Sequence, residues 1–148
     1  MRKKSIWMAI GIIFLTIFLR LPYVYEKILN LDEANFTIVA REILKGKLIY
    51  KDIIDTRPPL GYIIYLGVEL LNRKNTLLGI HLFGLLWIIL TTLVVIKVGN
   101  YVYKNNMGYV AGFFYSIFSM GYYPYDMVAV NAEIFMLLPL VLSFLFFS

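Results

Sequence analysis

The chain has 148 residues, of which 61% are hydrophobic, and its mean hydropathy is +0.77. Average globular domains are only about half apolar, so this composition excludes an ordinary soluble domain and indicates membrane spans. The absence of cysteine excludes disulfides and thiolate metal sites. The net charge is +5, but the lysine and arginine residues flank apolar segments and do not form a basic face for nucleic acid.

The first apolar segment, residues 5–25, follows the basic start Arg2-Lys3-Lys4 and predicts an uncleaved membrane anchor. A signal peptide begins in the same way, but no small-x-small cleavage site follows the apolar run here. A helix of this length rises about 31 Å, enough to cross a hydrocarbon core of about 30 Å. If the three cations stay inside, the N-terminus is cytoplasmic and the segment leads outward, with Arg20 near its outer end.

Residues 26–75 form the one long polar interval, which we expect to lie outside the membrane as a loop with interfacial helices. Asn30 and Asp32 both suit the N-cap of a helix that ends near Gly46. Apolar residues at helical spacing share one face of this helix, and polar residues are predicted to share the other. The apolar set is Phe36, Val39, Ala40, Ile43 and Leu44, and the polar set is Glu33, Thr37, Arg41, Glu42 and Lys45.

Pro58 and Pro59 open a second short helix, because proline is well tolerated in a first turn. From Pro58 to Leu71 this helix rises only about 21 Å, which is too short to cross a bilayer. We therefore predict a re-entrant or surface helix, with Glu69 at the membrane interface and Arg73 on the same side as the loop.

Three further apolar segments predict the remaining spans, over residues 76–98, 107–123 and 131–148. His81 interrupts the first of these, and we interpret it as a hydrogen-bonded structural residue near the outer end. Lys97 and Lys104 are expected in the following inner turn, and the aromatic cluster at residues 122–125 at the outer interface. The fold class is thus an all-α polytopic membrane protein with about four transmembrane helices. The short last span leads us to expect the amino-terminal piece of a longer protein.

Several short motifs follow one another in a particular order along the chain. Arg20 is followed by Asp32-Glu33-Ala34 at a helix start, Ala40-Arg41, Gly46, Tyr50-Lys51-Asp52, the run from Arg57 through Pro58-Pro59-Leu60 to Tyr62, and Asn131-x-Glu133. This ordered set resembles the GT-C superfamily of membrane glycosyltransferases. The most similar members are bacterial relatives of protein O-mannosyltransferases, the aminoarabinose transferase of lipid A and rhizobial galacturonosyltransferases. Phe36 stands where members often carry tyrosine.

The resemblance implies sugar transfer from a polyprenyl-phosphate donor to a glycan, lipid or protein acceptor on the outer face of the membrane. Asp32 would be the base that takes the acceptor proton, and Glu33 would assist or orient the acceptor. Arg57 would hold the lipid phosphate with its fork of donors. The other expected substrate contacts are Arg41, Tyr62 and Glu133. No metal ligands are assigned, a divalent metal stays an open alternative, and the fragment alone is expected to be inactive.

Each of these residues also has a plainer interpretation. Asp32 could be only an N-cap, Arg57 a lipid-headgroup anchor, and Arg41 the partner of Glu42 or a neighbour of Thr37. A different class of function is a small multi-span transporter subunit or membrane scaffold. A transporter favours charge pairs near the bilayer midplane, and the sequence places no acid or base deep in a span.

Overall fold

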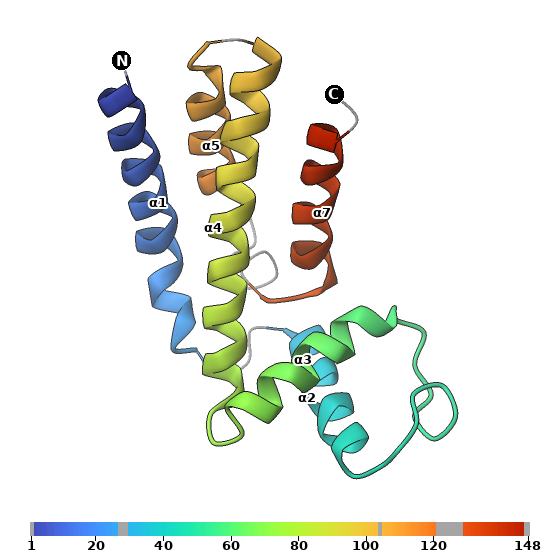
Figure 1. Cartoon of the computed structure of the whole chain (residues 1–148). Helices are drawn as coiled ribbons and strands as arrows, with labels where there is room; N and C mark the ends of the chain where they lie inside the picture. The colour runs from blue at the N-terminus through green and yellow to red at the C-terminus, as the bar shows by residue number, and fades with distance from the viewer. Residues whose placement is uncertain (1, 27–29, 104, 121–128, 147–148) are drawn as a thin grey trace.

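The computed structural model describes residues 2–26, 30–103, 105–120 and 129–146, and this part of the chain is helical without strands (Figure 1). The predicted all-α class is therefore confirmed for the described residues. The helices are α1 (Arg2–Val24), α2 (Leu31–Leu44), α3 (Pro59–Leu71), α4 (Thr76–Tyr103), α5 (Met107–Phe118) and α7 (Ala132–Phe146).

The longest helix, α4, is central: α1, α3, α5 and α7 all pack against it (Figure 1). Two helices are long and apolar enough to cross a membrane, α1 over Lys4–Val24 and α4 over its whole length. α5 and α7 are shorter, with 12 and 15 residues. The described structure thus supports two spans by length and composition.

Some boundaries differ from those predicted. α4 runs to Tyr103, beyond the predicted end at residue 98, so Lys97 lies within the helix and not in the following turn. Gly99 and Asn100 follow the predicted end, but the helix continues through both because they contact α5: Gly99 packs against the Cα of Gly108, and Oδ1 of Asn100 accepts from the N–H of Gly108 at 3.0 Å. α5 ends at Phe118, short of residue 123, and the predicted aromatic cluster and Lys104 fall outside the described residues.

Glycines allow α4 and α5 to pack backbone against backbone. A Cβ on Gly108 would lie 2.0 Å from the carbonyl oxygen of Ile96, and one on Gly99 would lie 2.6 Å from the Cα of Gly108. Small residues at such contacts are typical of helix pairs in membranes. Across the bundle, the hydroxyls of Thr16 in α1 and Ser116 in α5 are hydrogen-bonded at 2.8 Å.

Helices α2 and α3 lie outside the bundle of α1, α4, α5 and α7 and are called the outer helix pair for that reason alone. The pair lies beside the first turns of α4, away from α5 and the two termini (Figure 1). Local signals set its ends as predicted: Asn30 caps α2, Gly46 follows it with a φ of +91°, and Pro59 begins α3. Residues of the predicted apolar face, including Phe36, are buried together with Tyr62, Tyr65 and Val68 of α3. Burying large apolar side chains between the helices holds the pair together.

Candidate functional site

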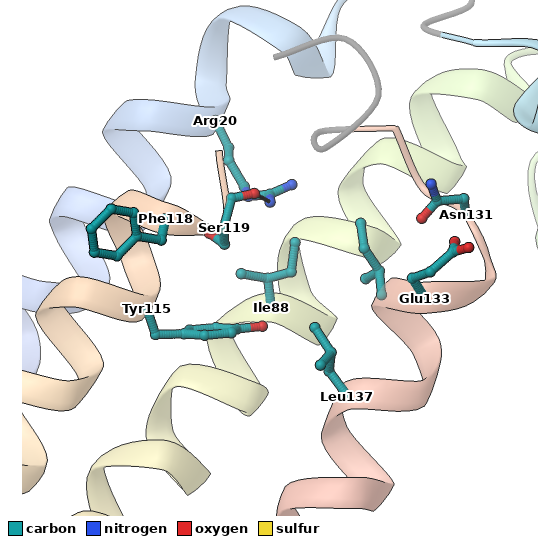
Figure 2. Close-up of a pocket in the computed structure, with 9 residues that line it drawn as sticks. Arg20, Ile88, Tyr115, Phe118, Ser119, Asn131, Glu133 and Leu137 are labelled. Carbon is teal, nitrogen blue, oxygen red and sulfur yellow. Dashed lines mark hydrogen bonds between the residues drawn. The ribbon is translucent and has the colours of Figure 1, made fainter. Parts of the chain in front are cut away.

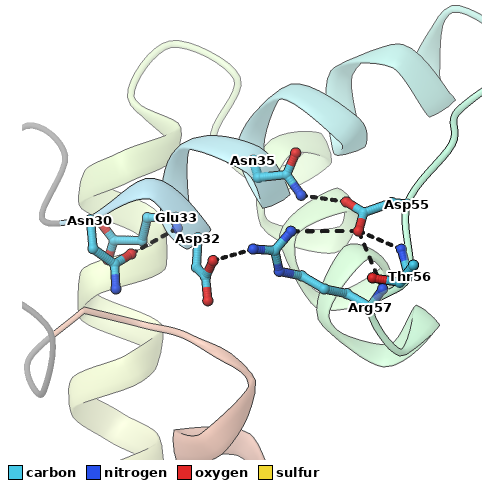
Figure 3. Close-up of polar contacts among 7 residues, drawn as sticks. All are labelled: Asn30, Asp32, Glu33, Asn35, Asp55, Thr56 and Arg57. Atoms are coloured by element: carbon cyan, nitrogen blue, oxygen red, sulfur yellow. Dashed lines mark hydrogen bonds and ion pairs between the residues drawn. The ribbon is translucent and has the colours of Figure 1, made fainter.

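Asp32, Asp55 and Arg57 form a charge cluster at one end of the outer helix pair (Figure 3). Arg57 donates from Nη2 to Asp32 and from Nη1 to Oδ1 of Asp55, the latter at 3.5 Å. Asp32 belongs to the first turn of α2, and the other two residues belong to the loop before α3. The side chains of Asp32 and Arg57 are 35% and 37% exposed, so a substrate can reach both.

Asp55 shapes the loop that carries Arg57. Its Oδ1 accepts hydrogen bonds from the backbone N–H groups of Thr56 and Arg57 at 2.7 and 3.2 Å, and its Oδ2 accepts one from the amide of Asn35 at 2.5 Å. The hydroxyl of Tyr50 donates to the carbonyl of Arg57 at 2.6 Å. These contacts fix the backbone of Thr56 and Arg57, and the guanidinium of Arg57 is therefore directed toward α2.

Two residues of the cluster, Asp55 and Arg57 in the loop before α3, remain charged. Burial opposes ionisation of Asp55, but the hydrogen bond from Asn35 and those from the two backbone N–H groups outweigh it, and the pKa of Asp55 falls from 3.8 to about 2. Burial alone would lower the pKa of Arg57, whereas the charges of Asp32 and Asp55 raise it above its ordinary value. Above about pH 4, Asp55 therefore remains a carboxylate that holds a charged Arg57.

Tyr62 and Phe36 lie under the cluster. Both are buried, and their rings pack edge to face with centroids 5.2 Å apart. The guanidinium of Arg57 lies 5.9 Å from the centroid of the Phe36 ring, within the range of a cation–π contact. Burial and the nearby Asp55 raise the pKa of Tyr62, although its hydroxyl makes no hydrogen bond of ordinary geometry within the described residues. Tyr62, a predicted substrate contact, therefore supports the cluster from inside the fold.

Glu33 does not belong to the cluster, because its side chain is fully buried. Its Oε1 accepts a hydrogen bond from the N–H of Val130 at 2.8 Å and lies 3.1 Å from Nε2 of His81. Nδ1 of His81 lies 3.1 Å from the carbonyl oxygen of Val24, so Nδ1 carries a hydrogen. His81 is thus hydrogen-bonded, as predicted, and its structural role stays an interpretation. The predicted polar face of α2 is wrong for Glu33 and for Thr37, which are both buried.

Arg41 is likewise separate from the cluster. Its Nε donates to Oε1 of Glu69 in α3 at 3.3 Å, and Glu69 also accepts a hydrogen bond from the hydroxyl of Thr76 at the start of α4. The predicted partner Glu42 pairs with two nearby lysines instead. Glu69 is only 3% exposed, so its carboxylate lies inside the fold, and its predicted position at the membrane interface stays a prediction. A buried carboxylate needs partners, and Arg41 and Thr76 provide them.

Glu133 lies at the start of α7, in the wall of a hollow between α1, α4, α5 and α7 (Figure 2). Within the described residues it makes no ion pair with Arg57 and so does not join the charge cluster. This cavity, called the Arg20 hollow below, has a volume of about 470 Å³. It is lined by Arg20, Ile88, Tyr115, Phe118, Ser119, Asn131, Glu133, Ile134 and Leu137.

The structure thus joins two of the six predicted site residues, Asp32 and Arg57, and adds Asp55 and Asn35, which had no assigned role. A local signal for Asp55 was available, since an aspartate commonly accepts hydrogen bonds from the backbone N–H groups that follow it in a turn. Asn35 carried no such signal, because its partner is 20 residues away.

Comparisons with models of protein families, with curated proteins and with solved structures found no match. Among the described residues, no group of three or more histidine, aspartate or glutamate side chains could hold a metal ion. The function must therefore be inferred from the chemistry of the charge cluster itself.

Proposed function

We propose that this chain contributes the acceptor-activating and phosphate-binding residues of a membrane glycosyltransferase. Its donor would be a polyprenyl-phosphate-linked sugar, and its acceptor a glycan, lipid or protein on the outer face of the membrane. The observation that carries the proposal is the contact between Asp32 and Arg57, a partly exposed carboxylate and guanidinium held side by side. Sugar transfer from a lipid phosphate needs this combination, a base for the acceptor hydroxyl and a cation for the phosphate.

The contact also suggests how donor binding prepares the base. In the described structure Arg57 is shared between two carboxylates. A phosphate that takes the guanidinium fork in a bidentate manner draws Arg57 away from Asp32. Once Arg57 has moved toward the phosphate, the carboxylate oxygens of Asp32 are free to accept a hydrogen bond from the acceptor hydroxyl. Asp55 stays bound to Arg57 and keeps it in position.

The reaction follows from this placement. Asp32 accepts the proton of the acceptor hydroxyl, whose oxygen forms a bond to the anomeric carbon of the sugar as the bond from that carbon to the phosphate oxygen breaks. The lipid phosphate leaves with the bonding electron pair, and Arg57 offsets its charge. In this proposal α5 and α7 also cross the membrane, giving four spans, and the outer helix pair lies on the external surface beside the donor. Metal dependence is left open.

A transporter subunit or scaffold is the competing candidate. The buried contact between Glu33 and His81 is the kind of pair that a transporter uses. However, His81 lies in the second turn of the 28-residue α4, close to the outer helix pair and far from the middle of the helix. The pair therefore supports the structural role better than a transport pathway.

Two conservative variants test the proposal. They are made in the full-length protein, which is reconstituted with a labelled polyprenyl-phosphate hexose and membrane acceptors. Asp32→Asn keeps the shape of the side chain, so loss of a base should lower turnover by at least about a hundredfold with little change in donor affinity. Arg57→Lys keeps the charge but loses the fork, and should raise the dissociation constant of the donor.

Asp52→Asn and Arg73→Lys are matched controls, because both side chains are exposed and lie outside the charge cluster. They should leave turnover and donor affinity unchanged. Near-normal turnover of Asp32→Asn would show that Asp32 is structural, and the base would then have to be sought at Glu33 or Glu133.

A further inference from the structure

The Arg20 hollow has apolar walls and a charge at each side. Ile88, Ile134 and Leu137 line it, and these side chains carry no hydrogen-bonding group. Figure 2 shows Arg20 reaching in from α1, while Asn131 and Glu133 lie on the opposite side at the start of α7. Such a cavity, mostly apolar with a few polar groups, is typical of a site for a small molecule or lipid.

Arg20 is incompletely satisfied although it is only 4% exposed. Its Nη2 donates to the carbonyl oxygen of Ser119 at 2.7 Å, but its buried Nε finds no acceptor in the described residues. Glu133 lines the same hollow, yet the two side chains form no ion pair in the described structure. A buried guanidinium without an anion is costly, and one placed between membrane helices is a mark of function.

We propose that the Arg20 hollow binds the headgroup of a zwitterionic phospholipid, with its phosphodiester at Arg20 and its primary ammonium at Glu133. A phosphodiester carries one negative charge, which matches the single guanidinium. Glu133 is exposed at the rim, where an ammonium can donate charge-assisted hydrogen bonds to it. A purely anionic headgroup would leave Glu133 without a counter-charge and would be repelled by it.

The surroundings of the hollow favour a lipid over a soluble zwitterion. α1 and α4, which form two of its walls, are the helices long and apolar enough to lie in a membrane. A lipid tail can therefore continue from the hollow along Phe118 and neighbouring apolar side chains, and burying that tail adds affinity that a free headgroup lacks. This inference does not depend on the proposed sugar transfer.

The test measures lipid binding to the whole chain, purified in detergent and stripped of lipid, by native mass spectrometry. The probes are phosphatidylethanolamine, phosphatidylglycerol and diacylglycerol with identical acyl chains, soluble phosphoethanolamine, and a polyprenyl phosphate. Each charged hydrogen-bonded contact should contribute about tenfold or more to affinity, so the expected order is phosphatidylethanolamine, then phosphatidylglycerol, then diacylglycerol. The soluble headgroup should bind more weakly than the first lipid.

Two variants separate the contributions of the charges. Glu133→Gln changes an exposed side chain and should remove the preference for phosphatidylethanolamine over phosphatidylglycerol. Arg20→Gln should weaken both phospholipids by about tenfold or more, whereas the exposed control Arg73→Gln should change neither. The proposal is overturned if diacylglycerol or soluble phosphoethanolamine binds as well as phosphatidylethanolamine, or if Glu133→Gln keeps the preference. It is also overturned if Arg20→Gln weakens polyprenyl phosphate more than phosphatidylethanolamine, whereas binding of polyprenyl phosphate that Arg20→Gln leaves unchanged belongs to the proposed donor site at Arg57.

Discussion

Replacing Glu33 by alanine should destabilise the protein far more than replacing its neighbour Asp32. The two carboxyl groups are adjacent in sequence but differ in environment. Glu33 is fully buried and accepts from the N–H of Val130, with Nε2 of His81 at 3.1 Å. Asp32 is 35% exposed and contacts a partly exposed arginine.

The expected magnitudes follow from this contrast. Glu33→Ala leaves two buried polar groups, on Val130 and His81, without a partner, and each such group costs about 1–3 kcal/mol. The loss should therefore be about 2–6 kcal/mol. Asp32→Ala removes a partly exposed ion pair, which is worth about 0–1 kcal/mol. Glu33→Gln keeps an oxygen that can accept the hydrogen bond from Val130, so it should recover part of the loss.

The free energy of unfolding can be followed in mild detergent by titration with a denaturant. Trp87 is a suitable fluorescent reporter, because its ring packs against Phe83 and Phe135 in the core. The expected order of stability is wild type, Asp32→Ala, Glu33→Gln and Glu33→Ala. If Glu33→Ala and Asp32→Ala unfold at the same denaturant concentration, the contacts of Glu33 with Val130 and His81 do not support the fold as argued.

Three other predictions concern the loop, the bundle and the topology. The pKa of Asp55 is about 2 in the folded protein and ordinarily 3.8, so its contribution to stability is present above pH 3.8 and is lost as the pH falls toward 2. The free energy of unfolding should therefore fall with pH in this range in the wild type, and it should fall less steeply in Asp55→Asn. Gly108→Ala, whose Cβ would meet the backbone of α4, should lower the melting temperature, whereas Gly67→Ala, with nothing within 4 Å of its Cβ, should not, and equal melting of the two would contradict the close packing. Single cysteines placed by Asp32→Cys, Arg73→Cys and Glu133→Cys should all react with an impermeant thiol reagent from the outer side, since the native chain has no cysteine to interfere; reaction of the first two from opposite sides would refute the non-crossing α3.

The outer helix pair was predictable because its signals are local. A capping asparagine, a glycine after the last turn and two prolines mark helix ends within a few residues of sequence. The apolar spacing of α2 likewise predicted which face packs, and Phe36 is buried on that face. The family resemblance assigned separate roles to Asp32 and Arg57, but it did not predict their contact, which the structure shows.

The remaining polar contacts could not be predicted because their partners are distant in sequence. Glu33 meets Val130 across 97 residues, and Arg41 meets Glu69 across 28. On a helical wheel Glu33 and Thr37 look like part of a solvated face, and only the approach of α4 and the residues before α7 buries them. The end of α4 escaped prediction for a similar reason, because α4 continues through Gly99 and Asn100, whose contacts with Gly108 of α5 are not visible in the local sequence.

Val130 also constrains the order in which the chain can assemble. Its N–H binds Glu33 of α2, and its carbonyl oxygen accepts from the hydroxyl of Tyr65 of α3 at 2.5 Å. Ribosomes add about 5–20 residues per second, so several seconds separate the synthesis of Tyr65 from that of Val130, 65 residues later. During that interval both outer helices exist without their common partner. The two outer helices can therefore form their hydrogen bonds to Val130 only when the chain leading into α7 packs beside α4. Both steps are then one late, coupled event of co-translational folding.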